Sequence, residues 1–141
     1  MSSTLDDLAQ TLPNGFHDAE LTHLSVDYAR GEVRLGLMIW IGEMSDETSG
    51  REAYRPAIVT VSGLVLLLID PPCEGYPFGE PGAVRIDGGP GQPATSRSEL
   101  PGIPDDAFLY WFFVDDWNAF IRVAARHATL EWTGAPRIGP G

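Results

Sequence analysis

The side chains best suited to acid–base or metal chemistry are the three histidines and the acids beside them. His17 stands directly before Asp18, and a histidine with a neighbouring carboxylate can serve as a general base or as a metal ligand. His127 lies far along the chain and could join them only if the fold brings it near. These three residues are the candidate site of a small hydrolase or metal-dependent enzyme. The favoured interpretation is structural: His17 is hydrogen-bonded at the start of a strand.

A zinc site shared by His17 and His23 is unfavourable. On one extended segment the two residues would lie roughly 20 Å apart, at a rise of 3.3 Å per residue. Two imidazoles on one zinc ion must bring their nitrogens within a few Å of each other, because each Zn–N bond is about 2.0 Å long. Only a turn near Asp18 would bring the two histidines together.

The other chemical signals are weaker. Asp18 and Glu20 would lie about 7 Å apart on one strand face, a spacing compatible with paired-carboxylate catalysis, but an exposed acidic rim is the favoured interpretation. Ser62 lacks the flanking glycines of a hydrolase nucleophile elbow, and residues 88–91 lack the lysine of a phosphate-binding loop. Cys73 is the only cysteine, which excludes an internal disulfide. We therefore assign no catalytic residue, no metal and no cofactor from the sequence.

The formal net charge of -11 is the clearest global property of the chain. Its basic residues are nine scattered arginines with no lysine, which argues against nucleic acid, because phosphate binding needs clustered positive charge. The same charge argues against an anionic membrane surface. A negative field could steer the chain toward a protein partner with a basic surface, although simple solubility is the favoured explanation of the charge.

The compartment is expected to be the cytoplasm. The first residues show no basic region followed by an apolar run, so no secretory signal is expected. The longest apolar run, residues 63–69, is far shorter than the about 20 residues that span a bilayer.

The elements that must position these residues are mainly β-strands. A chain of 141 residues predicts a single domain over residues 1–141, of the α+β class and mainly β, with an antiparallel sheet of five to seven strands. Residues 3–12 predict a short N-terminal helix. Alternating apolar residues over 24–28 and 33–41 predict a hairpin, with Gly31 in the turn.

The middle of the chain predicts a buried strand followed by a long loop. Residues 57–69 are apolar on both faces in their second half, which favours a central strand, and Gly63 suggests a bulge or the close approach of another backbone. Residues 71–106 contain 8 proline and 7 glycine residues, which predicts a covering loop that is partly disordered. Only residues 83–87 could pair there, as a short edge strand.

The C-terminal third contains the densest aromatic block, residues 108–114, which predicts a central strand. Residues 117–128 fit helical spacing, but they also fit strand alternation with a phase slip near Arg126 and His127, such as a β-bulge would produce. A turn at Asp115 and Asp116 that joins two antiparallel strands is the favoured alternative.

Two short motifs add a resemblance. The sequence Phe16-His17-Asp18-Ala19, and the segment from Asn118 through Leu130-Glu131-Trp132, resemble a group of small bacterial proteins. Most of these are uncharacterised, and some resemble immunity proteins that neutralise toxins. The resemblance implies that the closing segment is strand. It implies no catalytic residues, and it does not extend to residues 71–106.

Three functions follow as hypotheses. The first is a non-enzymatic binding protein, such as an immunity-like inhibitor, motivated by the acidic charge and the resemblance. The second is a small hydrolase or metal-dependent enzyme that uses His17, Asp18 and His127. The third is a homodimer whose aromatic strand forms the interface.

Overall fold

The computed structural model of the chain describes residues 3–42, 53–76, 84–91 and 102–138. In chain order its elements are the helix α1 (Leu5–Gln10), the strands β1 (Ala19–Asp27), β2 (Glu32–Trp40), β3 (Ala53–Ser62), β4 (Leu66–Ile69), β5 (Val84–Pro90) and β6 (Phe108–Val114), the 3-10 turn η2 (Asp115–Trp117), and the strands β7 (Ala119–Ala125), β8 (His127–Trp132) and β9 (Arg137–Ile138).

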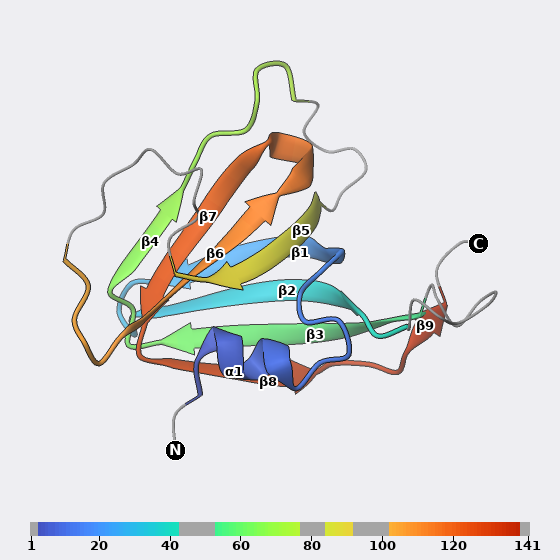
Figure 1. Cartoon of the computed structure of the whole chain (residues 1–141), viewed down its shortest axis with the longest axis horizontal. Helices are drawn as coiled ribbons and strands as arrows, with labels where there is room; N and C mark the ends of the chain where they lie inside the picture. Colours follow the sequence, from blue (N-terminus) through green and yellow to red (C-terminus); the bar gives the residue numbers. More distant parts are fainter. Residues whose placement is uncertain (1–2, 43–52, 77–83, 92–101, 139–141) are drawn as a thin grey trace.

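Eight strands form one open antiparallel sheet in the order β4-β7-β6-β5-β1-β2-β3-β8, and β9 pairs with β3. The expected class, mainly β with a short N-terminal helix, is confirmed. The expected count of five to seven strands is too low, because two segments that were expected to be continuous each divide into two strands. Figure 1 shows the result: β4, β7 and β6 run steeply across the direction of β2, β3 and β8, so the sheet is strongly bent.

Both divisions occur at one corner, where Gly63 meets Arg126. Gly63 has a φ of +64°, and a β-carbon there would lie 2.9 Å from the β-carbon of Arg126. The amide of Arg126 donates to the carbonyl of Ser62. Before the corner β3 pairs with β8, and beyond it β4 pairs with β7. The single strand predicted over residues 57–69 is therefore wrong, and the phase slip near His127 is a corner between two strands.

The ambiguity over residues 117–128 is resolved in favour of strand. The turn expected at Asp115 and Asp116 is the 3-10 turn η2, which ends at Asn118 in the left-handed conformation. The strands β7 and β8 follow it, and β7 pairs along its whole length with β6.

Strand β5 lies inside the sheet, between β1 and β6, so the prediction of an edge strand at residues 83–87 is wrong. Its glycines explain the position. A β-carbon at Gly88 would lie 2.9 Å from the ring of Tyr110, and one at Gly89 would clash with the indole of Trp111. Two glycines therefore let rings of β6 lie across both faces of β5. Residues 77–83 and 92–101 of the predicted loop lie outside the described residues.

The core lies on the inner face of the bent sheet. On β6 the alternate residues Tyr110, Phe112 and Val114 are buried there, and Phe16 packs edge-on against the first two rings. Helix α1 buries Leu5 against the same core. In Figure 1 the helix lies in front of β3 and β8. Within the part of the chain that the structure describes, no helix has the length and apolarity needed to cross a lipid bilayer.

The outer face of β6 and β7 carries a second group of aromatic side chains. The ring of Phe120 lies 5.1 Å from that of Phe113 and 5.8 Å from that of Trp111. Beside them Arg122, which is only 2% exposed, forms a two-pronged ion pair with Asp70, with both N–O distances 3.2 Å. The outer face is therefore partly aromatic and carries an almost fully buried guanidinium.

Candidate functional site

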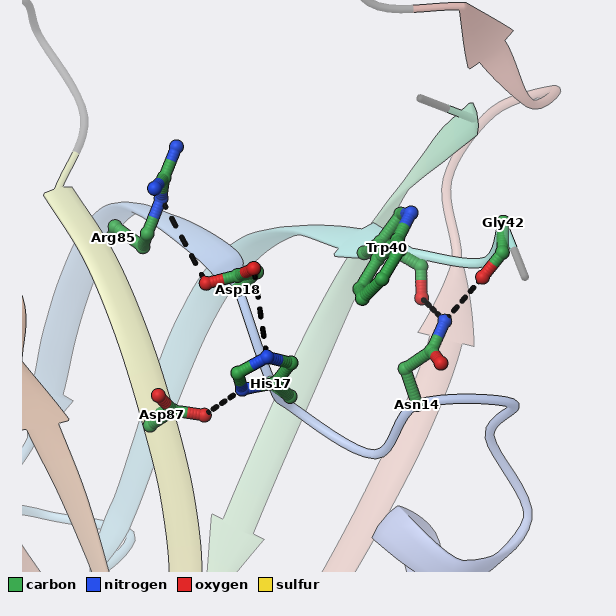
Figure 2. Close-up of polar contacts among 7 residues, drawn as sticks. All are labelled: Asn14, His17, Asp18, Trp40, Gly42, Arg85 and Asp87. Carbon is green, nitrogen blue, oxygen red and sulfur yellow. Dashed lines mark hydrogen bonds and ion pairs between the residues drawn. The ribbon is translucent and has the colours of Figure 1, made fainter. Parts of the chain in front are cut away.

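A short anchored turn places His17 just before β1, as Figure 2 shows. The side-chain amide of Asn14 donates to the carbonyl oxygens of Trp40 and Gly42, which fixes the turn to the end of β2. The amide of His17 then donates to the carbonyl of Asn14. Asp18 takes a φ of +55°, in the left-handed region that non-glycine residues rarely adopt. This turn aims the His17 side chain back toward β5.

The imidazole of His17 lies between two carboxylates. Its Nδ1 is 2.5 Å from Oδ1 of Asp87 on β5, and its Nε2 is 3.5 Å from Oδ2 of Asp18. The ring also lies 6.1 Å from that of Trp40, which is buried. The His17 side chain is 56% exposed, so the cluster is open to solvent on one side. Both ring nitrogens are thus directed at acids of the chain itself.

The two carboxylates change the acid–base behaviour of the histidine. The hydrogen bond to Asp87 is the largest influence and raises the pKa of His17 above its ordinary value of 6.5. The charges of Asp87 and Asp18 act in the same direction, whereas partial burial and the positive charge of Arg85 oppose the rise in pKa. His17 therefore keeps its proton to a higher pH than a free histidine.

Four acids surround Arg85 at this end of β1 and β5, and we call Asp18, Glu20, Asp87 and Asp116 the acidic rim. The Nε of Arg85 is 4.0 Å from Oδ1 of Asp18, and its backbone amide donates to Oδ2 of Asp116. Glu20 is directly opposite Arg85 in the β1–β5 ladder, and Asp87 follows it on the same face of β5. Acids from three segments of the chain therefore lie near one arginine, whose guanidinium forms an ion pair with Asp18.

His17, Asp18 and Asp87 also form a group of potential metal ligands, because one donor atom of each lies within 4.8 Å of the others. The donors suit a divalent ion such as zinc, which accepts imidazole nitrogen and carboxylate oxygen. The distances assign different roles in metal binding to the three residues. Nε2 of His17 and the carboxylate of Asp18 could bind the ion, while Asp87 would orient the ring through Nδ1, as a carboxylate behind a metal-bound histidine does. Arg85 opposes cation binding here.

The structure does not bring His127 to this cluster. His127 is opposite Ser62 on β3, which is opposite Glu32 on β2, which is opposite Asp27 at the far end of β1. His17 precedes the near end of β1, so the nine residues of that strand separate the two histidines by about 26 Å along the sheet. Of the sequence-derived candidates, only His17 and Asp18 belong together.

His23 occupies a separate place on β1. A β-carbon at Gly36 of β2 would clash with the His23 ring, so the imidazole lies over the glycine of the neighbouring strand. The register of the β1–β2 ladder shifts between Leu21 and His23. Among the described residues, the group of potential ligands around His17 does not include His23.

Asp87 is the member of the cluster that the sequence did not reveal. It lies 70 residues from His17 in the chain. The alternation of Arg85, Ile86 and Asp87 indicates that the two charged residues share a face of a strand, but nothing local indicates that this strand pairs with β1.

Comparison of the chain with protein-family models, with curated proteins and with solved structures gives no match. The function must therefore be argued from the chemistry of the site itself.

Proposed function

We propose that the protein is a non-enzymatic binding protein that recognises a basic surface on a partner protein, in the manner of an immunity-like inhibitor. The observation that carries the proposal is the acidic rim, in which Asp18, Glu20, Asp87 and Asp116 gather around one arginine. Such a patch, on a chain of net charge -11, attracts a positively charged surface and accelerates encounter with it.

The contacts of His17 support binding over catalysis. A general base needs a ring nitrogen free to take a proton from a substrate or a nucleophile. Both nitrogens of His17 instead face carboxylates, and the raised pKa favours the protonated ring. This arrangement suits a fixed salt-linked element of a recognition surface. The segment around Phe16 resembles a group of small bacterial proteins, some of which resemble immunity proteins, and this resemblance supports the same conclusion.

The test is binding to the product of the gene beside its own. Affinity and association rate would be measured by calorimetry and surface plasmon resonance at two salt concentrations. Replacing Glu20 and Asp87 by lysine should slow association about tenfold or more, because charges at the edge of an interface act mainly on the association rate. The matched control replaces Asp27 and Glu32 by lysine as well, because they are a cross-strand acidic pair at the far end of β1. Equal losses in both variants, or no binding neighbour at all, would contradict the proposal.

A metal-dependent hydrolase is the second candidate, favoured by the three donors within 4.8 Å. Zinc and manganese would be titrated into chelator-treated protein, and hydrolysis of ester and phosphoester substrates would be measured with and without the metal. Metal binding that is lost in His17→Ala but kept in His127→Ala, accompanied by turnover, would favour this function over binding.

A homodimer is the structural alternative. Strand β4 ends the sheet, and its Ile69 is 44% exposed. Light scattering that gives twice the chain mass of 15.3 kDa would support it, and a monomer at micromolar concentration would exclude it.

A further inference from the structure

The outer face of the sheet carries a row of two aromatic rings with a carboxylate at each end. Asp87 on β5 is opposite Phe113 on β6, and Phe113 is opposite Phe120 on β7. The amide of Phe120 donates to the carboxylate of Asp70, which closes the row. Because residues opposite each other in a ladder emerge on the same face, the two acids and the two rings are neighbours in the order acid, ring, ring, acid.

One half of this row already holds a guanidinium. Both terminal nitrogens of Arg122 donate to the two oxygens of Asp70, each over 3.2 Å. The central carbon of the same guanidinium lies 5.7 Å from the centre of the Phe120 ring. A planar cation held by a carboxylate fork and an aromatic ring is the arrangement that arginine forms and lysine cannot reproduce.

The other half offers the same two groups, and among the described residues no arginine is paired with them. Asp87 and Phe113 are a cross-strand pair, so their β-carbons are about 5 Å apart, close enough for one guanidinium to contact both side chains. Arg85, two residues before Asp87 on β5, directs its Nε to Asp18 instead. Oδ1 of Asp87 contacts His17, and within the described residues Oδ2 has no hydrogen-bond or ion-pair partner. The Asp87 side chain is 44% exposed, so an outside group can reach it.

We propose that Asp87 and Phe113 form a binding site for an arginine side chain of a basic partner, equivalent to the site that Asp70 and Phe120 provide for Arg122. This inference rests on the proposed function and names the residue type that the partner presents. Charge supports this occupant. The acidic rim and Asp70 bring five carboxylates to this part of the outer face, where the cations among the described residues are the guanidiniums of Arg85 and Arg122 and the protonated imidazole of His17. Two strand spacings, about 10 Å, separate Asp87 from Phe120, so a second guanidinium fits without displacing the first.

The direct test uses tetra-arginine amide and tetra-lysine amide as probes of the intact chain. Titrations followed by backbone amide NMR should show the largest shifts around Asp87 and Phe113. Tetra-arginine should bind about two- to fivefold more tightly than tetra-lysine, the advantage expected of a stacked guanidinium at an exposed site. Equal affinity for the two peptides, or shifts spread evenly over all acidic residues, would overturn the inference.

Two substitutions examine the two groups separately. Phe113→Leu keeps an apolar side chain but removes the aromatic face, and Asp87→Asn removes the charge with little change of shape. Each should reduce tetra-arginine affinity about two- to fivefold and narrow the difference from tetra-lysine. The matched controls are Tyr28→Leu, an aromatic residue that is 91% exposed after β1, and Asp27→Asn. Melting temperatures would show whether Phe113→Leu still folds, and Asp87→Asn carries the test if it does not.

Failure of this inference is distinguishable from failure of the proposed function. A neighbouring protein whose binding is weakened by lysine at Glu20 but unchanged by Phe113→Leu and Asp87→Asn would overturn the arginine site and leave the binding function intact. A site that prefers tetra-arginine, on a chain that binds none of its neighbours, would support the arginine site and count against the function.

Discussion

Gly63 and Arg126 occupy the two sides of a single corner, with the arginine side chain lying where a glycine β-carbon would be. The backbone amide of Arg126 donates to the carbonyl just before this glycine, and one terminal nitrogen of its guanidinium lies 3.5 Å from the glycine's own carbonyl oxygen. The guanidinium continues to Asp106, 2.9 Å away. Two chain segments that are distant in sequence therefore change direction together.

Replacing Gly63 by alanine should destabilise the protein strongly. The residue has a φ of +64°, which costs a residue with a side chain about 1–2 kcal/mol, and the new methyl group would also press on Arg126. Urea unfolding would measure the loss. Gly91→Ala is the matched control, because Gly91 has a φ of +79° but nothing within 4 Å of its β-carbon position. If Gly63→Ala lowered the free energy of unfolding no more than Gly91→Ala does, the contact with Arg126 at the corner would be unimportant for stability.

Removing either charge of the Arg122–Asp70 ion pair should lower the free energy of unfolding. Arg122 is almost completely buried, and leaving one member of such a pair alone costs about 3–5 kcal/mol when both are buried. Because the Asp70 side chain is 29% exposed, we expect Asp70→Asn to lower the free energy of unfolding by about 2 kcal/mol.

The pair of Arg30 and Asp27 provides the comparison for that measurement. Its side chains are 70% and 51% exposed and 3.9 Å apart, so Asp27→Asn should change the free energy of unfolding by less than about 0.5 kcal/mol. Similar losses at Asp27 and Asp70 would mean that burial of Arg122 does not strengthen its ion pair.

The protonation of His17 should depend on Asp87. Because the hydrogen bond to that carboxylate is the main cause of the raised pKa, Asp87→Asn should move the His17 titration toward 6.5 when followed by NMR of the ring protons. The folded-state pKa lies above the unfolded value. The resulting stabilisation is therefore fully present below about pH 6.5 and is lost as the pH rises through the folded-state pKa. A His17 titration that is unchanged in Asp87→Asn would contradict the assigned contact.

Alanine at Gly89, which is buried within β5, should destabilise the sheet. The new methyl group would meet the indole of Trp111, which lies across the glycine from the adjacent strand. We expect a loss of about 1–3 kcal/mol, the usual cost of overpacking, together with a change in tryptophan fluorescence. An unchanged melting temperature and emission spectrum would show that Trp111 can move aside freely.

The parts of the fold that sequence predicts well are those in which neighbours in space are neighbours in the chain. The hairpin of β1 and β2 follows from alternation and from one glycine at positive φ. The internal position of β5 and its extension to Pro90 do not follow, because only residues 83–87 were predicted to pair, as an edge strand, and the glycines and the proline after them are typical of a loop. The two glycines are explained only by the tertiary structure, in which Tyr110 lies over Gly88 and Trp111 lies over Gly89.

The residues of the candidate site were also predictable only where they are neighbours in the sequence. His17 and Asp18 are adjacent in sequence and could be singled out, whereas Asp87 depends on a pairing of β5 with the first residues of β1. His127 was a reasonable candidate by residue type alone. Its strand lies on the other side of β3, so the topology rather than the chemistry excludes it from the cluster.

Helix α1 rests on β8, and the carbonyl of Ser3 accepts a hydrogen bond from the amide of Ala128. During synthesis the first three strands can therefore meet soon after they are made, whereas the helix must wait for nearly the whole chain. Ser62 on β3 waits equally long for its partner His127. A ribosome-bound intermediate of this protein would expose Leu5 and one edge of β3 until β8 emerges, and exposed apolar surface and unpaired strand edges favour aggregation.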